Sequence, residues 1–388
     1  MDNKVYIVRC PDYAQAAAKL EELMALMGGM SQFAAAQEKI LLKVNLLQPA
    51  KPEQAVSTHP EVIAAIARMA KQTGAVPLIA DSPGSGYKYT ENTLKTLYQT
   101  CQIFRAAEAA GVQVNLDTTY ELVSFPQGKL IKHFEVITPV LKANGIFNLC
   151  KLKTHLYMGM TGAVKNNFGV IPGLAKVGYH AKLHDKEHFA GMLLDLAEYV
   201  APRLSIMDAI TGMEGEGPGA SGTPRQIGLL IGSRNPLALD VVAAEIIGLP
   251  RDQNPVLLAA AKRGLGPTRI EEVEVEGVNL PEILIPDFRF PRTVEGTGLG
   301  SLSWWQKLLK PIIKNGFSLT PRIVRKKCIG CGICRDSCPV KTITVEGNGR
   351  KYARINTKNC IRCYCCHELC PKKAVELNES LVYRMVNR

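Results

Sequence analysis

Eight cysteines near the C-terminal end of the 388-residue chain constrain its fold more than any other feature of the sequence. They form two copies of one pattern, C-x2-C-x2-C-x3-C, and each copy is followed directly by a proline. Three thiolates at this close spacing wrap three corners of a [4Fe–4S] cube, while the fourth cysteine lies beyond a turn and reaches the other cube. The pattern therefore predicts two [4Fe–4S] clusters bound by this part of the chain.

The crossing of the fourth cysteine predicts which sulfurs bind each cluster. One cluster is expected to bind Cys328, Cys331, Cys334 and Cys370. The other cluster is expected to bind Cys360, Cys363, Cys366 and Cys338. Cys365 fits neither copy of the pattern, so it is interpreted as a spare thiol, with substitution as a cluster ligand as the alternative.

Two other kinds of cysteine site fit the pattern less well. Zinc ribbons use paired C-x2-C units with a longer gap and four ligands for each metal ion. Disulfide frameworks suit small secreted scaffolds, whereas this chain has 388 residues and starts with no recognisable export signal. We therefore expect metal-binding thiols in a reducing compartment and a cytoplasmic protein.

The chain is long enough for two or three domains. We expect an α/β domain at residues 1–286, a linker at residues 287–320 and a ferredoxin-type domain at residues 321–388. No apolar run reaches the ~18 residues that a membrane span requires. Within the linker, residues 304–314 combine Trp, Leu and Lys. They are predicted to form a helix between the domains, with an interfacial membrane contact as the alternative.

Positive charge is concentrated in the cysteine-rich part of the chain. Residues 322–388 contain fifteen Lys and Arg against five Asp and Glu, which is +10 of the net charge of +12. Bound clusters are anionic and offset part of this surplus. The remaining charge favours an acidic redox-partner protein or an anionic substrate. Nucleic acid is less favoured because no known nucleic-acid-binding module accompanies the charge.

The first three hundred residues alternate between short β-rich runs and longer helical stretches. Strands are expected at residues 4–9, 40–44, 76–80, 145–149, 204–207 and 227–231. Helices are expected at residues 13–27, 60–72, 92–110, 186–200 and 237–247. This order predicts an α/β fold with a mainly parallel sheet that helices cover on both faces. Residues 116–137 resemble an inserted hairpin that could separate two lobes.

Polar residues follow several of the expected strands, at the carboxyl edge where α/β proteins place their functional groups. The candidates are Lys43, Asn45, Asp81, Ser82, Lys151, Lys153, Thr154, His155 and Asp208. Several lysine amines in one place repel each other unless an anion lies among them. The sequence therefore predicts a pocket for a phosphate or carboxylate, unless these lysines point outward from loops.

Two glycine-rich segments extend this argument. Residues 160–169 place Thr161 where it could cap a helix and expose backbone amides to an anion, with Lys165 one turn further on. Residues 214–222 form either a mobile loop over the pocket or a plain surface turn. Neither segment has the spacing of a nucleotide-binding loop.

Three histidines recur at intervals of four residues, at His180, His184 and His188. On one helical face they could bind a transition metal. We favour the alternative in which His184 or His180 points into the lysine pocket as an acid or base, while the others are solvated.

Several of these segments, taken in order, resemble the domain-of-unknown-function 362 family. The resemblance rests on residues 151–155, 160–166, Asp208 with residues 213–218, and residues 235–240, and it covers most of residues 1–280. Members of that family are often fused to a ferredoxin-type tail. The resemblance implies a fold, leaves the reaction open, and marks eight site candidates. These are Lys43, Asn45, Lys153, His155, Lys165, Asn166, Asp208 and Asp240.

Together these features predict an iron–sulfur oxidoreductase or electron-transfer protein whose clusters serve a lysine-lined pocket. Lys153 and Lys165 would hold an anion, and His155 or His184 would move protons. Asp208 would orient the ligand or bind a cation. Two alternatives are a binding, maturation or sensing protein with structural clusters, and a non-redox isomerase or hydrolase. No convincing nicotinamide or flavin motif is present in the sequence.

Overall fold

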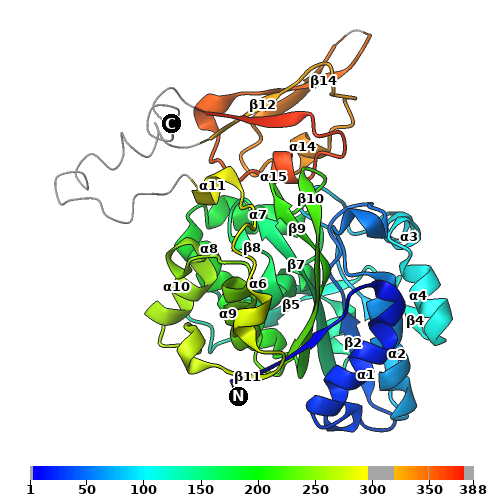
Figure 1. Cartoon of the computed structure of the whole chain (residues 1–388). Coiled ribbons are helices and arrows are strands. Elements are labelled where there is room, and N and C mark those ends of the chain that lie inside the picture. Colours follow the sequence, from blue (N-terminus) through cyan, green and yellow to red (C-terminus); the bar gives the residue numbers. More distant parts are fainter. Residues whose placement is uncertain (1–2, 296–318, 348, 380–388) are drawn as a thin grey trace.

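The computed structural model describes residues 3–295, 319–347 and 349–379 of the chain. A large α/β domain carries a smaller, cysteine-rich domain at one end (Figure 1). Residues 304–314, for which a linker helix was predicted, lie outside the described residues. Within the described part of the chain, no helix combines the length and apolar character needed to cross a membrane.

The large domain is built on one mixed sheet of nine strands. The strands are β1 (Lys4–Arg9), β2 (Lys39–Lys43), β3 (Val76–Ala80), β4 (Gln113–Val114), β7 (Gly145–His155), β8 (Gly159–Met160), β9 (Leu204–Gly215), β10 (Gly222–Ser233) and β11 (Glu274–Gly277). Their order is β11-β1-β10-β9-β7-β2-β3-β4, and β8 pairs with β7. Within the sheet, the neighbouring strands β9, β7, β2, β3 and β4 pair parallel to one another. Strand β10 is antiparallel to both of its neighbours, β1 and β9. The predicted α/β fold is confirmed. The sequence left open whether this domain is divided into two lobes, and the structure has one continuous sheet instead.

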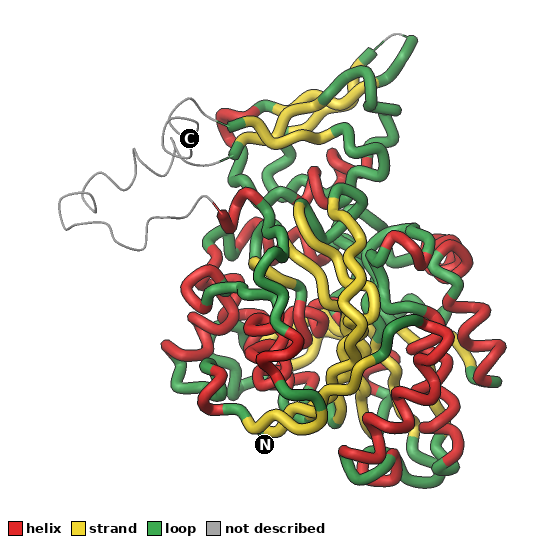
Figure 2. The backbone as a smooth tube through the Cα atoms, viewed as in Figure 1, coloured by secondary structure: helices red, strands yellow, loops and turns green. Residues whose placement is uncertain are grey.

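Helices cover both faces of this sheet, as Figure 2 shows. One face packs against α1 (Ala16–Leu26), α2 (Pro60–Gln72), α3 (Glu91–Thr100) and α4 (Ile103–Ala110). The other packs against α6 (Gly162–Asn166), α8 (Lys186–Val200), α9 (Pro236–Ile246) and α10 (Pro255–Lys262). Shorter helices are α5 (Thr138–Leu141), α7 (Ala175–Lys182) and α11 (Arg292–Glu295). The central strands are therefore buried on both sides, which suits their apolar composition.

Local sequence signals explain where several helices begin. His59 caps α2 by accepting a hydrogen bond from the Glu61 amide, and a proline occupies the first helical position. Asp185 caps α8, and Asn235 caps α9, again with proline directly after it. Such caps satisfy amides that have no partner inside the helix. The predicted helices at residues 60–72 and 186–200 match α2 and α8.

The structure differs from the sequence-based prediction at two kinds of place. The single helix expected at residues 92–110 is broken between α3 and α4, where Gln102 adopts a left-handed conformation with φ of 57°. Strands β7 and β9 continue well beyond their predicted ends. Lys151 and Lys153 looked like loop residues, but they lie inside β7 because their amines find partners within the fold.

The hairpin predicted at residues 116–137 is present. It consists of β5 (Tyr120–Ser124) and β6 (His133–Ile137), which pair antiparallel in a sheet of their own. Residues 287–295, which the prediction placed in the linker, pack instead on the α/β domain. Phe288 and Val294 belong to its buried core because their side chains complete the apolar cluster around α9.

The small domain consists of two antiparallel strand pairs and two short helices. The pairs are β12 (Thr320–Ile323) with β15 (Val375–Asn378), and β13 (Ile343–Glu346) with β14 (Tyr352–Ile355). The helices are α14 (Ile333–Asp336) and α15 (Cys365–Glu368). Helix α15 faces the α/β domain (Figure 1).

Glycines permit a close approach between the two domains. A methyl group on Gly86 would lie 2.9 Å from side-chain atoms of Ile333 and Leu369 in the small domain. A methyl group on Gly219, in the loop between β9 and β10, would overlap the backbone carbonyl of Glu368. At Gly219 only a residue without a side chain fits, because the contact is with backbone.

Candidate functional site

A pocket of about 70 Å³ lies where the α/β domain meets the small domain. Most of its walls come from the carboxyl ends of β2, β3 and β7 and from α6 and α7. The small domain contributes Glu368, the last residue of α15. The side chains that matter for its chemistry are Asn45, Asp81, Ser82, Lys153, His155, Thr161, Lys165, Asn166, Lys176, His180 and Glu368. The prediction that polar residues gather at this edge of the sheet agrees with this placement.

Four buried lysines in or near the pocket have partners inside the protein. Lys43 forms an ion pair with Asp81 at 3.0 Å. Lys153 donates to the Val56 carbonyl. Lys176 donates to the Ser82 hydroxyl at 2.8 Å and to two backbone carbonyls. Lys151 pairs with Asp208 and is described below. These contacts hold the loops around the pocket together, because a buried ammonium needs several acceptors.

Lys165 differs from these four lysines. It lines the pocket from α6, and within the described residues its amine has no hydrogen bond or ion pair. Burial lowers the pKa of Lys165, while the neighbouring Glu368 opposes that shift. Lys165 is therefore the pocket amine best placed to hold an anion from outside the chain.

Burial also lowers the pKa of the other pocket bases. It lowers the pKa of Lys176 to about 7 and the pKa of Lys153 well below its ordinary range, with the Lys165 charge adding to the second effect. His155 and His180 shift in the same direction, and the pKa of His180 falls to about 3. In an empty pocket these groups tend toward their neutral forms, and a bound anion would favour their protonated forms.

Three asparagines form a chain of hydrogen bonds behind the pocket. Asn45 donates to Asn166 at 2.8 Å, Asn166 donates to Asn148 at 2.7 Å, and Asn148 donates to the Ala163 carbonyl at 2.9 Å. The predicted site residues Asn45 and Asn166 are thus brought together. The chain fixes which end of each amide faces its neighbour.

The two histidines that line the pocket, His155 and His180, contact different groups. His155 Nδ1 accepts a hydrogen bond from the Tyr157 amide at 3.1 Å, which places the ring proton on Nε2. Glu368 Oε1 lies 3.3 Å from the same Nδ1, but that nitrogen has no proton to donate and the oxygen stays without a hydrogen bond. His180 stacks on Phe189 with 4.4 Å between ring centroids.

The predicted proton carrier His184 does not line the pocket. It is exposed and lies between α7 and α8, and its backbone carbonyl accepts a hydrogen bond from Tyr157. His188 is exposed as well and pairs with Asp185. Because α7 ends at Lys182, the three histidines do not share one helical face. His180, the second option in the prediction, is the one that reaches the pocket.

Asp208 lies outside the pocket in a separate buried network. Its carboxylate accepts hydrogen bonds from Lys151 at 2.7 Å, from the Tyr13 hydroxyl and from the His59 amide. The Tyr13 and His59 rings stack with 3.4 Å between their centroids. A register shift in the pairing of β7 with β9, between Lys151 and Lys153, accompanies this separation. The carboxylate is fully satisfied by the fold, which argues against the predicted role in binding a ligand or cation.

Asp240 and Thr161 also differ from their predicted roles. The Asp240 carboxylate accepts hydrogen bonds from the amides of Ala163 and Val164 at the start of α6. Thr161 makes no capping hydrogen bond. The amides that were expected to bind an anion are therefore already occupied, and burial raises the pKa of Asp240 to about 7. Asp240 positions α6, and with it Lys165.

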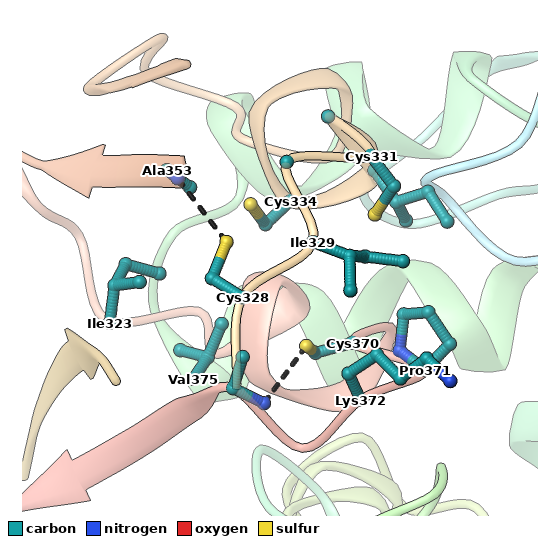
Figure 3. A pocket seen from close by; sticks show the side chains of 14 residues that line it. Ile323, Cys328, Ile329, Cys331, Cys334, Ala353, Cys370, Pro371, Lys372 and Val375 are labelled. Atoms are coloured by element: carbon teal, nitrogen blue, oxygen red, sulfur yellow. Dashed lines mark hydrogen bonds between the residues drawn. The ribbon is translucent and has the colours of Figure 1, made fainter. Parts of the chain in front are cut away.

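The eight cysteines of the two motifs line two hollows in the small domain. Cys328, Cys331, Cys334 and Cys370 line the first, which Figure 3 shows from close by. Cys338, Cys360, Cys363 and Cys366 line the second. This is the grouping that the sequence predicts, although the assignment of each sulfur to a cluster stays a prediction. Among the described residues, no three His, Cys, Asp or Glu side chains are grouped to hold a single metal ion.

The surroundings of the sulfurs fit iron–sulfur clusters. Backbone amides donate to four of them, at 3.3 Å to Cys328, 3.1 Å to Cys370, 3.3 Å to Cys338 and 3.4 Å to Cys360. Two of these bonds appear in Figure 3. Amide donors of this kind stabilise the negative charge of cluster sulfur and help to set the reduction potential. Cys365 is buried and is not among the residues that line either hollow.

Known protein families match both domains of the chain. The family described as domain of unknown function DUF362 matches residues 40–245. A 4Fe–4S dicluster domain matches residues 327–374. The thylakoid-associated protein sll1697 of Synechocystis sp. is 35% identical over 313 residues, which covers 76% of this chain and 94% of that protein.

The chain belongs to the DUF362 family. This confirms the resemblance drawn from the motifs. Among solved structures, the lactate racemase apoprotein from Thermoanaerobacterium thermosaccharolyticum matches with a TM-score of 0.39 and 12% identity. That match covers 61% of this chain and 55% of the racemase. A TM-score of this size does not establish a shared fold.

In this DUF362 chain, sequence reasoning missed two pocket residues. Lys176 follows no predicted strand and carries no motif, so no local signal marks it. Glu368 lies between Cys366 and Cys370, where the cysteine pattern leaves intervening residues undefined. An acidic residue among so many basic ones was the available signal for Glu368.

Proposed function

We propose that this DUF362 protein is an iron–sulfur oxidoreductase in which two [4Fe–4S] clusters exchange electrons with a small anionic ligand in the lysine pocket. One observation carries the proposal. Helix α15 supplies Cys366 to the second hollow and Glu368 to the pocket. A cluster in that hollow and a ligand in that pocket would therefore lie on two sides of the same short helix.

The chain's own residues support binding and proton handling in such a reaction. Lys165 supplies an amine that has no hydrogen-bond or ion-pair partner among the described residues, and His155 carries its proton on Nε2 because Nδ1 is occupied. The small domain adds Glu368 to the wall of the pocket, and the burial of these polar groups strengthens charge interactions among them. When bound, the clusters supply one-electron steps. The protein supplies the orientation and the protons.

The first hollow offers a route to a partner protein. Cys331 is exposed, and Lys372 and Ile329 beside it are exposed as well. The cysteines of the second hollow are less accessible. Electrons from an acidic redox partner would enter at the first cluster, pass to the second and reach the pocket. Basic residues around the first hollow favour such an encounter through long-range attraction.

The first test is anaerobic purification with iron and sulfide analysis, followed by a potentiometric EPR titration. Two clusters that reduce and reoxidise without loss of iron are expected. Addition of glycolate, acetate or phosphate as anionic probes should shift the potential of at least one cluster, because a bound negative charge opposes reduction. Clusters that lose iron on reduction would favour a structural or sensing role.

A matched pair of variants ties the potential shift to the pocket. Lys165→Gln should abolish the ligand-induced shift while leaving iron content unchanged. Lys95→Gln is the control, because Lys95 is an exposed residue of α3 that pairs with Glu91. An unchanged shift in Lys165→Gln would show that the pocket has no part in the electron transfer.

A further inference from the structure

Four buried side chains of the pocket each leave a polar atom without a partner. These atoms are Asn45 Oδ1, Thr161 Oγ1, His180 Nδ1 and Glu368 Oε1. All four residues line the pocket and are at most 8% exposed. Buried polar atoms in native proteins nearly always have a hydrogen-bond partner. Their convergence on one small cavity indicates that a polar ligand completes the site.

The chain of asparagines decides which end of Asn45 needs that partner. The Ala163 carbonyl can only accept hydrogen bonds, so its partner must be the amide nitrogen of Asn148, which donates. The Asn148 oxygen then accepts from Asn166, and the Asn166 oxygen accepts from Asn45. The amide nitrogen of Asn45 therefore points along the chain, which leaves its oxygen as the free group. A ligand next to Asn45 must donate a hydrogen bond.

Lys165 sets the opposite requirement. Its amine lines the same cavity and, among the described residues, is paired with no carboxylate. An ammonium that is partly removed from water needs an anion or several acceptors to offset its lost hydration. The pocket is thus complementary to a ligand with two different ends, one acidic and one that donates a hydrogen bond.

Charge and size narrow the choice further. Lys153, Lys165 and Lys176 all line the cavity. Of its lining carboxyl groups, Asp81 already pairs with another lysine, and burial raises the pKa of Glu368 to about 8. An ammonium on the ligand would therefore meet more positive than negative charge, which disfavours amino acids. A hydroxyl donates a hydrogen bond without adding charge. A cavity of about 70 Å³ accommodates about five water-sized atoms, which favours a short ligand over nucleotides and long acids.

We propose that the pocket binds a short hydroxycarboxylate, with its carboxylate at Lys165 and its hydroxyl donating to Asn45 Oδ1. This inference rests on the proposed function, because it names the ligand class of the same pocket. Glycolate has about five non-hydrogen atoms and is the simplest probe of this class. Acetate is its matched control, since it has the same charge and lacks only the hydroxyl.

Isothermal titration calorimetry on the anaerobic, cluster-loaded protein tests the proposal. Glycolate is expected to bind about tenfold more tightly than acetate, because acetate leaves the buried Asn45 oxygen unpaired. Equal affinities, or tighter binding of sulfate than of glycolate, would overturn the hydroxycarboxylate class. This comparison uses the unaltered protein and so does not depend on the folding of a variant.

Two variants then assign the ends of the ligand. Lys165→Gln should weaken the binding of glycolate and the binding of acetate by the same large factor. Asn45→Ala should remove the preference for glycolate and leave acetate binding nearly unchanged. A preference that survives in a folded Asn45→Ala protein would mean that the hydroxyl is recognised elsewhere, and the proposed orientation would be wrong.

Failure of this inference is distinguishable from failure of the proposed function. If glycolate binds preferentially but shifts neither cluster potential, the ligand class holds and the redox role fails. If acetate and sulfate shift a potential as strongly as glycolate does, the redox role holds and the ligand class fails.

Discussion

The cluster domain and the lysine pocket assemble their functional side chains in different ways. The eight motif cysteines lie within 43 consecutive positions, 328–370. The pocket draws residues from positions as far apart as Asn45 and Glu368. Short-range spacing fixes the first site, whereas the order of strands in the sheet and the docking of a second domain fix the other.

This difference affects what each residue contributes. Every cysteine of the two motifs lines one of the hollows. In and around the pocket, by contrast, residues of the same type have different tasks. Lys43 and Lys176 hold loops together through internal partners, while Lys165 remains available to a ligand. A residue type alone therefore predicts function in the cluster domain and fails to do so in the pocket.

Removal of a cluster ligand should give the largest effect. Cys366→Ser is expected to lose about half of the bound iron and to destabilise the small domain, because a serine hydroxyl is a poor ligand for this cluster. Iron and sulfide analysis measures the loss. Cys365→Ser is the matched control on the same helix, and its iron content should equal that of the unaltered protein. Equal losses in the two variants would contradict the predicted ligand set.

Substitutions of two lysines, Lys43 behind the pocket and Lys165 in its lining, should separate an effect on stability from an effect on ligand binding. Lys43→Met leaves Asp81 buried without its ion partner and should cost about 3–5 kcal/mol of unfolding free energy. Lys165→Gln should change stability little but weaken anion binding about a hundredfold. Chemical denaturation and calorimetry on both proteins test the distinction. If Lys165→Gln were the more destabilised of the two, the division between structural and ligand-binding lysines would be wrong.

The contact between the two regions can be weakened with a single methyl group. Gly219→Ala places a carbon against the Glu368 backbone and should cost about 1–3 kcal/mol at the domain interface. Faster limited proteolysis between the domains would report it. Gly178→Ala is the control, because Gly178 lies in a helix and a methyl group there has no atom within 4 Å apart from its chain neighbours and the backbone of its own helix. Equal proteolysis rates in the two variants would argue against a close interface.

The smallest expected effect is a pH dependence of binding. Burial lowers the pKa of Lys176 to about 7 in the ligand-free pocket. A bound anion favours the protonated amine and raises that pKa, so binding takes up protons near neutral pH. Affinity should therefore fall as pH rises above about 7, by at most about tenfold per pH unit for one amine.

Calorimetry in two buffers of different ionisation heat measures this proton uptake directly. Glycolate should give different apparent heats in the two buffers, and the difference should shrink below about pH 6, where the amine is already protonated. Identical heats at pH 7 would show that the pocket amines do not change protonation when the ligand binds.

Much of the fold could be read from local patterns. Strands β1 and β3 and helices α2 and α8 have the predicted bounds, because alternating or helical apolar periodicity and clear caps mark them. The ends of β7 and β9 could not be predicted. Their polar residues are buried only because partners such as Asp208 and Val56 are brought from elsewhere in the chain.

The sequence by itself determined the cluster chemistry and the α/β class, since both depend on spacing and periodicity along the chain. Only the tertiary structure decided which polar residues form the pocket. It separated Asp208 and Asp240 from the cavity, replaced His184 with His180, and added Lys176 and Glu368. The physical reason is that a buried charge is stabilised by whichever partners the fold brings near it, and those partners are distant in sequence.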